Sequence, residues 1–543
     1  MSTARSMWSP LGEPVYRALW IAAVVSNVGS FMQEIGSAWL MTTIRPEPLM
    51  VSLLQTAAYL PFFVMAVPAG AFADVIDKRK LLMFGQLWML LSSLALGILS
   101  IYNLITPWTL LALTLMLAVG GAITGPAWNA AIPELVPKEK LEPAIALGGV
   151  GYNAARGVGS ALGGLAVAKL GAGPVFILNA ISFVGVLVVF FFWKPEPKKL
   201  SKHPRERIVG AIKAGFRFVR HSPALKAVLI RSGSYGACTS AMWALLPLIA
   251  KEELHLDSMG YGALLAIFGA GTLLGAFILP RLRSAISLDQ VTGFGKLLFA
   301  GSLIGISNAQ NLVTASLFMI GAGVSWIVVN SMFSMGAQKA SPAWVRARAL
   351  AFHILVFLGT FAITSAIWGQ VAAYTGLDIP LMIAAGLLVL SLFLTKPFPL
   401  GIAEVIDTTM SDHWSDPKFS SEPHPNHGPV LVTVEYIIDP NRLDEFTEAM
   451  TSLSIQRRRD GAFQWHLFCD VSSPQKQLET FFVESWAEHM RQHERVTVSD
   501  RLVEDKVNAF HVGTNPIVVR HLINSYIPAE LLKQITVEEQ EAI

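Results

Sequence analysis

The feature that most constrains this chain is a series of long apolar segments, which recur about twelve times before residue 400. Each holds roughly twenty mostly apolar residues, the length that a helix needs to cross a hydrocarbon core about 30 Å thick. We expect helices, because backbone groups in lipid must form hydrogen bonds within their own segment. The predicted spans are 16–42, 50–73, 81–101, 108–131, 142–169, 174–193, 224–250, 259–280, 290–307, 310–334, 347–374 and 379–395.

The composition excludes a water-soluble protein for most of the chain, but not for its end. Of the 543 residues 53% are hydrophobic and only 15% are charged, which is unlike a soluble globular domain. Residues 1–400 hold 29 Lys and Arg against 15 Asp and Glu, whereas residues 401–543 hold 12 against 23, with eight of the twelve histidines. We therefore expect lipid around the first part and water around the second. The two cysteines are too few for a disulfide framework or a cysteine-rich metal site.

Basic residues gather in alternate loops, and this sets the predicted orientation. Loops on the cytoplasmic side of a membrane carry an excess of Lys and Arg. The rich loops hold Lys78–Lys80, Lys138–Lys140, 194–220, Arg281–Arg283 and Lys339–Arg348. The sequence thus predicts a multi-pass protein of the inner (plasma) membrane with both termini cytoplasmic and no cleavable signal peptide.

The longest basic loop divides the spans into six and six. Gly70-Ala71-Phe72 recurs as Gly275-Ala276-Phe277, and internal repeats of this kind are how transporters build a site at the membrane midplane. Within the loop, Arg207–Arg220 is predicted to be an amphipathic basic helix on the inner lipid surface. The predicted fold is an all-α membrane protein with 12 transmembrane helices in two six-helix halves, followed by a C-terminal α+β ferredoxin-like domain. The predicted parts are the halves 1–193 and 223–398, the basic linker 194–222, a linker 399–427, the cytoplasmic domain 428–526 and a tail 527–543.

One loop motif carries a family resemblance. The segment Gly70-Ala71-Phe72-Ala73-Asp74-Val75-Ile76-Asp77-Lys78-Arg79-Lys80 resembles the loop signature of the major facilitator superfamily, with Asp77 where many members have a second glycine. Gly70 allows close helix approach, and Asp74 at a helix end can hold a cationic partner or a helix N-terminus. An ionic latch of this kind can close one face of a transporter, and the alternative is a basic anchor with incidental acids. The predicted gating motif is Gly70, Asp74, Asp77, Lys78 and Arg79.

Further segments narrow the resemblance to one branch of that superfamily. Gly125-Pro126-Ala127-Trp128-Asn129 and Asn153-Ala154-Ala155-Arg156-Gly157, each with its continuation, look like the branch of enterobactin exporters and drug:proton antiporters, the transmembrane secretion effectors. Ser160 stands where the antiporter signature usually has proline. The resemblance implies alternating access driven by a proton gradient, with no bound cofactor. It also implies a helix-bending motif, which holds Gly159, Gly163 and Gly164.

Charged side chains inside the spans are costly in lipid and are therefore candidates for function. Glu34 and Arg156 suggest a hypothesis in which the two pair in one state and Glu34 is protonated in the other. The alternative is a permanent salt bridge that fixes the first helix on the fifth. Arg231 is either functional or a residue that reaches to the interface, and His353 titrates near neutrality if unperturbed. The predicted residues for proton coupling or substrate contact are Glu34, Arg156, Asn27, Gln33, Phe31, Arg231 and His353.

The tail after residue 428 has the pattern of a small α+β domain. Strand and helix patterns follow each other in the order β-α-β-β-α-β, with one helix expected over 487–510, and this order is that of a ferredoxin-like fold. The tail resembles the antibiotic biosynthesis monooxygenase family, small dimeric domains, through Glu484-Ser485-Trp486-Ala487-Glu488-His489-Met490-x-x-His493. Trp486, His489 and His493 form a predicted pocket. The two histidines can bind a metal, but spacing identifies no third ligand, so we predict no metal site and no catalytic residues.

Together these patterns predict a secondary active transporter, not an enzyme, although the C-terminal domain leaves that second point open. It would export a siderophore-like or drug-like small molecule across the inner membrane by proton antiport. The predicted partners are that substrate, protons, the lipid bilayer and a second copy of the chain bound through the C-terminal domain, but no nucleic acid. One alternative is a bifunctional protein whose cytoplasmic domain modifies the ligand, as an oxygenase or otherwise. Another is a transporter whose tail only dimerises or senses ligand.

Overall fold

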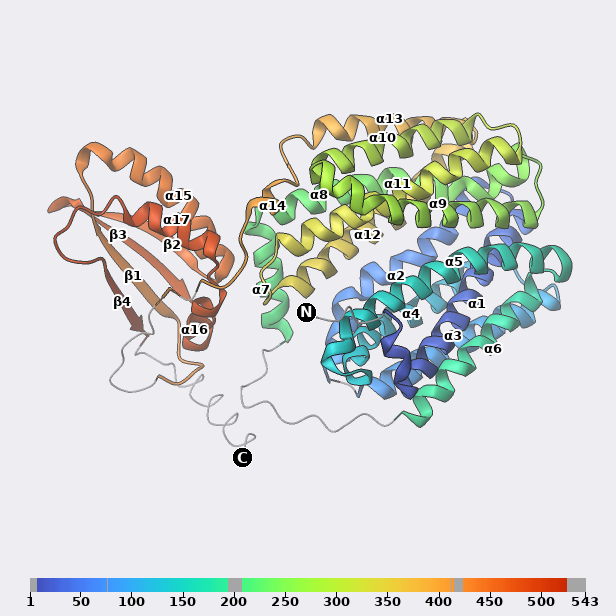
Figure 1. Cartoon of the computed structure of the whole chain (residues 1–543), viewed down its shortest axis with the longest axis horizontal. Coiled ribbons are helices and arrows are strands. Elements are labelled where there is room, and N and C mark those ends of the chain that lie inside the picture. Colours follow the sequence, from blue (N-terminus) through green and yellow to red (C-terminus); the bar gives the residue numbers. More distant parts are fainter. Residues whose placement is uncertain (1–6, 76, 194–207, 412, 415–422, 525–543) are drawn as a thin grey trace. The chain divides into compact units, whose positions relative to one another are not determined.

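The computed structural model describes residues 7–75, 77–193, 208–411, 413–414 and 423–524, with the backbone alone for 66–75, 208–212 and 403–404. The predicted linker 194–222 lies partly outside the described residues, as does the linker 399–427, and the tail 527–543 lies wholly outside them. Two compact units result (Figure 1). The first gathers 1–205, 227–336 and 350–401, and the second gathers 206–226, 337–349 and 402–543.

The first unit consists of two sets of six helices. The first set is α1 (Pro14–Ile44), α2 (Pro48–Val75), α3 (Lys78–Ile101), α4 (Pro107–Leu135), α5 (Leu141–Leu170) and α6 (Ala172–Phe192). The second set is α8 (Pro223–Leu248), α9 (Ser258–Ala285), α10 (Leu288–Ser307), α11 (Leu312–Lys339), α12 (Arg346–Thr375) and α13 (Asp378–Leu394). Among the described residues, eight of these helices are long and apolar enough to span a membrane by themselves. The predicted fold class is confirmed.

Small residues bring α5 close to two other helices. A methyl group added at Gly159 would lie 2.7 Å from the backbone oxygen of Val28 on α1. One added at Gly164 would lie 2.8 Å from the Cα atom of Gly262 on α9. Side chains larger than hydrogen would push these helices apart, which is why small residues mark membrane helix contacts. The glycines of the predicted helix-bending motif therefore lie in close helix packing, and bending itself stays a prediction.

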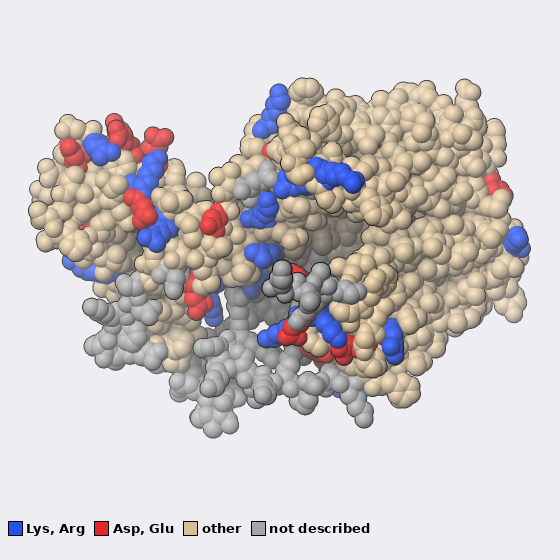
Figure 2. Space-filling model, in the orientation of Figure 1, with Lys and Arg blue, Asp and Glu red and all other residues tan. Residues whose placement is uncertain are grey.

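The two sets of helices meet near the end of the bundle where α1 ends and α8 ends. Lys251 donates a hydrogen bond to the backbone oxygen of Thr42 over 2.6 Å, and the rings of Trp39 and Tyr261 stack with centroids 6.2 Å apart. Farther along, the Thr56 hydroxyl donates to the backbone oxygen of Ala362 over 2.7 Å. Toward the opposite end, the surface is hollowed between the two sets (Figure 2). The first unit is thus closed at one end and open at the other.

The second unit contains the α+β domain. Its elements are β1 (Val430–Ile437), α15 (Leu443–Asp460), β2 (Phe463–Asp470), β3 (Ser473–Val483), α16 (Trp486–Arg495), α17 (Val498–Asn508) and β4 (Val518–Ile523). The sheet has the order β2-β3-β1-β4, and all of its pairs are antiparallel. One buried cluster fills the space between sheet and helices and includes Tyr436, Phe446 and Met450. This is the predicted ferredoxin-like arrangement.

The single helix expected over 487–510 is wrong, because the structure has two. Helix α16 ends at Arg495, and α17 begins at Val498. Thr497 caps α17: its hydroxyl accepts from the backbone N–H of Asp500, whose carboxylate accepts from the backbone N–H of Thr497. Reciprocal capping of this kind satisfies backbone donors that a helix start leaves unpaired. A new helix therefore begins at this point.

Helix α7 (Ile208–His221) does not lie on lipid with its apolar face, as the sequence had suggested. Within the second unit it packs against α15, and Ala214 and Phe218 are buried. Arg217 pairs with Glu488 of α16 over 2.9 Å. A basic amphipathic helix can bury its apolar face against an acidic protein surface as well as against a membrane. The sequence pattern alone does not distinguish the two.

Candidate functional site

Two of the predicted charged residues meet in the interior of the first unit. Glu34 lies ten residues before the end of α1, about 15 Å along the helix axis, and Arg156 projects from α5 beside it. Both are half-buried. The Arg156 charge acts on Glu34, yet no ion pair within 4.0 Å joins them among the described residues. The arrangement differs from the permanent salt bridge that was the structural alternative.

Aromatic rings surround the Arg156 guanidinium instead. Its central carbon lies 5.3 Å from the ring centroid of Phe31, 5.6 Å from Tyr152 and 5.9 Å from Trp243. Such cation–π contacts each contribute roughly 0.5–2 kcal/mol, depending on desolvation. Trp243 belongs to the second set of helices, so this arginine lies where the two sets face each other. We call Phe31, Glu34, Tyr152, Arg156 and Trp243 the central group.

The aromatic surface continues from the central group into the second set of helices. Trp243 makes an edge-to-face contact with Trp326 at 5.6 Å, and Trp326 contacts Phe361 at 6.3 Å. Phe361 in turn meets Tyr59 of α2 at 5.1 Å. The Trp243 indole N–H is buried with no acceptor among the described residues. An aromatic wall with a free donor, one acid and one guanidinium suits a bulky molecule with polar groups.

Gln33 and Asn27, which were also predicted for this site, make no hydrogen bond with the central group in the part of the chain that the structure describes. Gln33 is 2% exposed, and its amide oxygen accepts from Asn179 of α6 over 2.6 Å and from the Ser93 hydroxyl of α3. It therefore ties three helices of one half together. Asn27 is half-buried two turns before Glu34.

Arg231 and His353 lie away from the central group. Arg231 pairs with Asp289 of α10 over 2.6 Å and donates to the backbone oxygen of Thr395. Asp289 also accepts from the backbone N–H groups of Leu400 and Gly401. These contacts join α8, α10 and the end of α13 within one half. His353 is 4% exposed, and its Nδ1 has no hydrogen-bond partner among the described residues.

One buried charge was missed by sequence reasoning. Lys296 of α10 is 1% exposed, and its ammonium donates to the hydroxyls of Ser391 over 3.1 Å and Ser234 over 3.4 Å. No carboxylate pairs with it among the described residues. The sequence did carry a signal, because Lys296 is the seventh residue of the predicted span 290–307 and so lies too deep for a lysine that belongs to the loop. A charge this deep in a span is a functional candidate by default.

The loop of the predicted gating motif is described only in part. Gly70 and Asp74 are described by their backbone alone, so the latch stays a prediction. Asp77 caps α3 by accepting from the backbone N–H of Lys80 over 3.0 Å. Lys78 pairs with Glu134 of α4 over 2.6 Å, and Arg79 donates to the backbone oxygen of Phe190 near the end of α6 over 2.8 Å. Cations at helix C-termini are stabilised by the helix dipole, so the basic cluster holds this half together.

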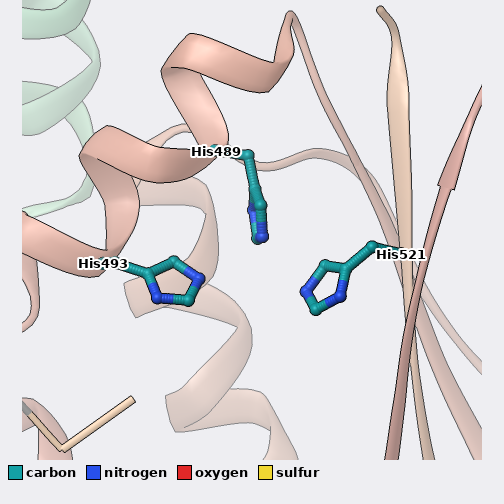
Figure 3. A group of neighbouring side chains, drawn as sticks. All are labelled: His489, His493 and His521. Atoms are coloured by element: carbon teal, nitrogen blue, oxygen red, sulfur yellow. The ribbon is translucent and has the colours of Figure 1, made fainter. Parts of the chain in front are cut away.

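The predicted pocket of the second unit gains a member. Trp486 is 6% exposed and packs in the core, whereas His489 and His493 face His521 of β4 (Figure 3). Burial, and then the neighbouring His521 and His493, lower the pKa of His489 to about 3. The His489 ring is therefore neutral at neutral pH. His521 lies in β4. It approaches the other two histidines because β4 pairs with β1, and the spacing of residues in the sequence does not predict that pairing.

A buried ionic network lies beside that pocket. Arg457 of α15 pairs with Glu479 of β3 over 3.2 Å and with Glu504 of α17 over 2.7 Å. Burial alone would raise the pKa of Glu504, but the Arg457 charge and the hydrogen bonds from His413 and Trp414 outweigh it and lower the pKa to about 2. Each charge in the network has an opposite partner. The network is a structural device of the domain.

Comparisons with known proteins agree with this architecture. A family model described as "Transmembrane secretion effector" matches residues 5–528, and so takes in the C-terminal domain as well. Macrolide efflux protein A of Streptococcus pyogenes is 23% identical over 321 residues, which are 57% of this chain and 72% of that protein. The Staphyloferrin A transporter of Staphylococcus aureus is 22% identical over 282 residues, 51% of this chain and 70% of that protein.

A solved structure shares the fold of the first unit. It is a bacterial homologue of the human lysosomal transporter Spinster, in an inward-facing and unoccupied conformation. Its TM-score is 0.55 at 14% sequence identity, and the match covers 74% of this chain and 98% of that chain. At this identity the likeness concerns the fold alone.

Proposed function

The chain belongs to the transmembrane secretion effector family of membrane transporters, and on that premise we propose that it exports a bulky, drug-like or siderophore-like molecule by proton antiport. The observation that carries the proposal is the central group. Glu34 and Arg156 lie near the middle of the bundle, between the two sets of helices, without forming an ion pair. Charged groups within the membrane that do not neutralise each other are costly in free energy. We therefore assign them a role in binding or coupling.

The proposed cycle uses Glu34 as the proton carrier. In this cycle the group is reached from the hollow at the open end, and we take that end as cytoplasmic because the distribution of Lys and Arg predicts it. A substrate that enters there meets the aromatic wall and displaces the proton from Glu34. After the bundle opens at its other end, protonation of Glu34 from outside releases the substrate, and the proton is carried inward.

The proposed substrate class rests on the aromatic rings around the central group and is supported by the relatives. An aromatic wall from Tyr59 to Trp243 offers apolar contact area, and Glu34 and Arg156 offer one charge of each sign. Amphipathic molecules with polar groups at their edge fit such a surface. Proteins named for macrolide efflux and for staphyloferrin A transport are among the relatives.

The test compares Glu34→Gln with the natural chain in vesicles under an imposed pH gradient. The probes are a macrolide, a fluorescent amphipathic cation and a catecholate siderophore. We expect Glu34→Gln to abolish uphill transport while substrate exchange without a gradient persists, because only the proton step is lost. Glu47→Gln is the matched control, since Glu47 is exposed and paired with Arg45. Unchanged uphill transport by Glu34→Gln would contradict the proposed coupling.

For the C-terminal domain we propose homodimerisation through the sheet face that lies away from its helices. Leu431, Leu478 and Phe482 lie on this face, and Phe482 stacks on the exposed Phe463 at 5.8 Å. Among the described residues no helix of the domain covers it. The mass of the full chain in detergent, with Leu478→Lys as the variant, tests this: we expect a dimer that the variant dissociates. A monomer, or turnover of heme or quinone by the full chain, would favour a ligand-binding or ligand-modifying domain instead.

A further inference from the structure

Three histidines converge at one edge of the C-terminal domain. His489 and His493 lie one turn apart on α16, and His521 lies on β4, where it pairs with Val432 of the central strand β1. Figure 3 shows the three rings directed toward one another from the helix and the strand. One nitrogen from each ring lies within 4.8 Å of the others. The ring of His489 is 5.0 Å from that of His493 and 4.7 Å from that of His521, between centroids. We call these residues the histidine cluster.

The hydrogen bonds of His489 determine which of its nitrogens faces a ligand. Its Nδ1 lies 3.3 Å from the side-chain oxygen of Gln492. An amide oxygen only accepts, so Nδ1 carries the hydrogen and Nε2 keeps its lone pair. That Nε2 is buried and has no hydrogen-bond partner among the described residues, on a side chain only 2% exposed. An outer partner that fixes the tautomer of a ligating histidine is typical of metal sites.

We propose that His489, His493 and His521 bind one divalent transition-metal ion, with zinc as the reference case. Imidazole nitrogens suit zinc, copper and nickel, and it is the neutral imidazole that binds metal. A tetrahedral zinc ion with bonds of about 2.0–2.1 Å holds its ligand atoms roughly 3.3 Å apart. The present separations of up to 4.8 Å therefore have to shorten by about 1.5 Å when the ion binds all three rings.

The surroundings of the cluster fit a site with an open coordination position. Trp486 lies 5.6 Å from the His489 ring, and Trp414 lies 5.0 Å from the His493 ring, between centroids. Apolar rings around a metal limit the access of water and strengthen the bonds to its ligands. Three protein ligands leave a fourth position for water or for a polar group of a bound molecule. The site is independent of the central group and of proton coupling.

The test uses the full chain in detergent, with an affinity tag that contains no histidine. After removal of metal by a chelator, the chain is titrated with Zn²⁺ by calorimetry and with Co²⁺ by visible absorption. We expect one equivalent of metal per chain and the intense bands of a four-coordinate cobalt site. His521→Ala should weaken binding by at least about 100-fold, and Gln492→Leu by about tenfold, because loss of an outer partner loosens a ligand.

Controls separate a built site from scattered surface binding and from misfolding. His466→Gln is the matched control, because His466 is an exposed histidine on β2 of the same domain and lies outside the cluster. Hydrogen exchange of β1 and α15 shows whether each variant keeps the domain folded. His493→Gln is the second ligand variant if His521→Ala unfolds β4. Metal binding that is absent, or that His466→Gln reduces as much as the ligand variants do, would overturn the proposal and leave the cluster as packing of neutral rings.

Discussion

Two arginines, one in each unit, show how similar aromatic surroundings serve different ends. Arg156 contacts three rings and has no carboxylate within 4.0 Å among the described residues. Arg457 contacts Trp414 at 5.0 Å and Phe481 at 5.5 Å, and also pairs with Glu479 and Glu504. The charge of Arg457 is fully balanced by protein, so it stabilises one structure. The charge of Arg156 has no such partner, which is the arrangement expected under our proposal that it responds to a proton or a ligand.

The largest effect that tests this contrast is on transport. We expect Arg156→Met to abolish uphill efflux and to leave the thermal midpoint of the first unit within a degree or two of the natural value. The reason is that no ion pair is lost, and that removing the desolvation cost of the buried guanidinium offsets the lost cation–π contacts. The methionine side chain still packs on the rings. Efflux and thermal unfolding of the same preparations measure both. If the variant unfolds at a much lower temperature, Arg156 stabilises the structure, as Arg457 does.

The matched change in the other unit has the opposite signature. Arg457→Met leaves two buried carboxylates without a counter-charge, and breaking a buried ion pair in this way costs roughly 3–5 kcal/mol. Native-state hydrogen exchange of the β1 and α15 amides in the full chain reports this loss. Transport per folded molecule should change little. If exchange of these amides is unaffected, the network does not stabilise the domain.

The same network makes the stability of the C-terminal domain depend on pH. The pKa of Glu504 is lowered from 4.5 to about 2, so the folded domain favours the ionised form more than the unfolded chain does. The resulting stabilisation, about 3 kcal/mol, is present above pH 4.5 and is lost as the pH falls from there toward 2. Glu504→Gln should be less stable than the natural chain at pH 7 and should show a shallower loss on acidification. Hydrogen exchange of the domain, corrected for its intrinsic pH dependence, measures the free energy of unfolding at each pH. If that free energy falls equally steeply on acidification in the two chains, this assignment is contradicted.

Sequence patterns that extend over many residues predicted the architecture, whereas individual side-chain contacts could not be predicted from them. Apolar windows show the two sets of helices, and alternation shows the strands, because both properties are summed over many residues. Gln33 and Glu34 are neighbours in sequence, yet one ties helices together and the other faces the site, and only the positions of α3 and α6 distinguish them. His521 joined the histidine cluster through strand pairing, which spacing does not encode. The break at Thr497 did carry a signal, a Thr-x-x-Asp capping pattern that was overlooked.

The smallest predicted effect concerns Lys296. Like Arg457 it is buried, but like Arg156 it has no carboxylate partner among the described residues. In the part of the chain that the structure describes, its ammonium donates to the Ser234 and Ser391 hydroxyls alone. Because a buried cation without a counter-charge is unfavourable, we expect Lys296→Met to raise the stability of the first unit by roughly 1 kcal/mol, a shift of about 2–4 °C in thermal midpoint. We also expect transport to fall, because a charge buried within a span is a candidate for function. Arg231→Met is the control: its ion pair with Asp289 is balanced, so its loss should lower the midpoint. A destabilised Lys296→Met variant with intact transport would place Lys296 with the balanced charges and restrict the unbalanced class to the central group.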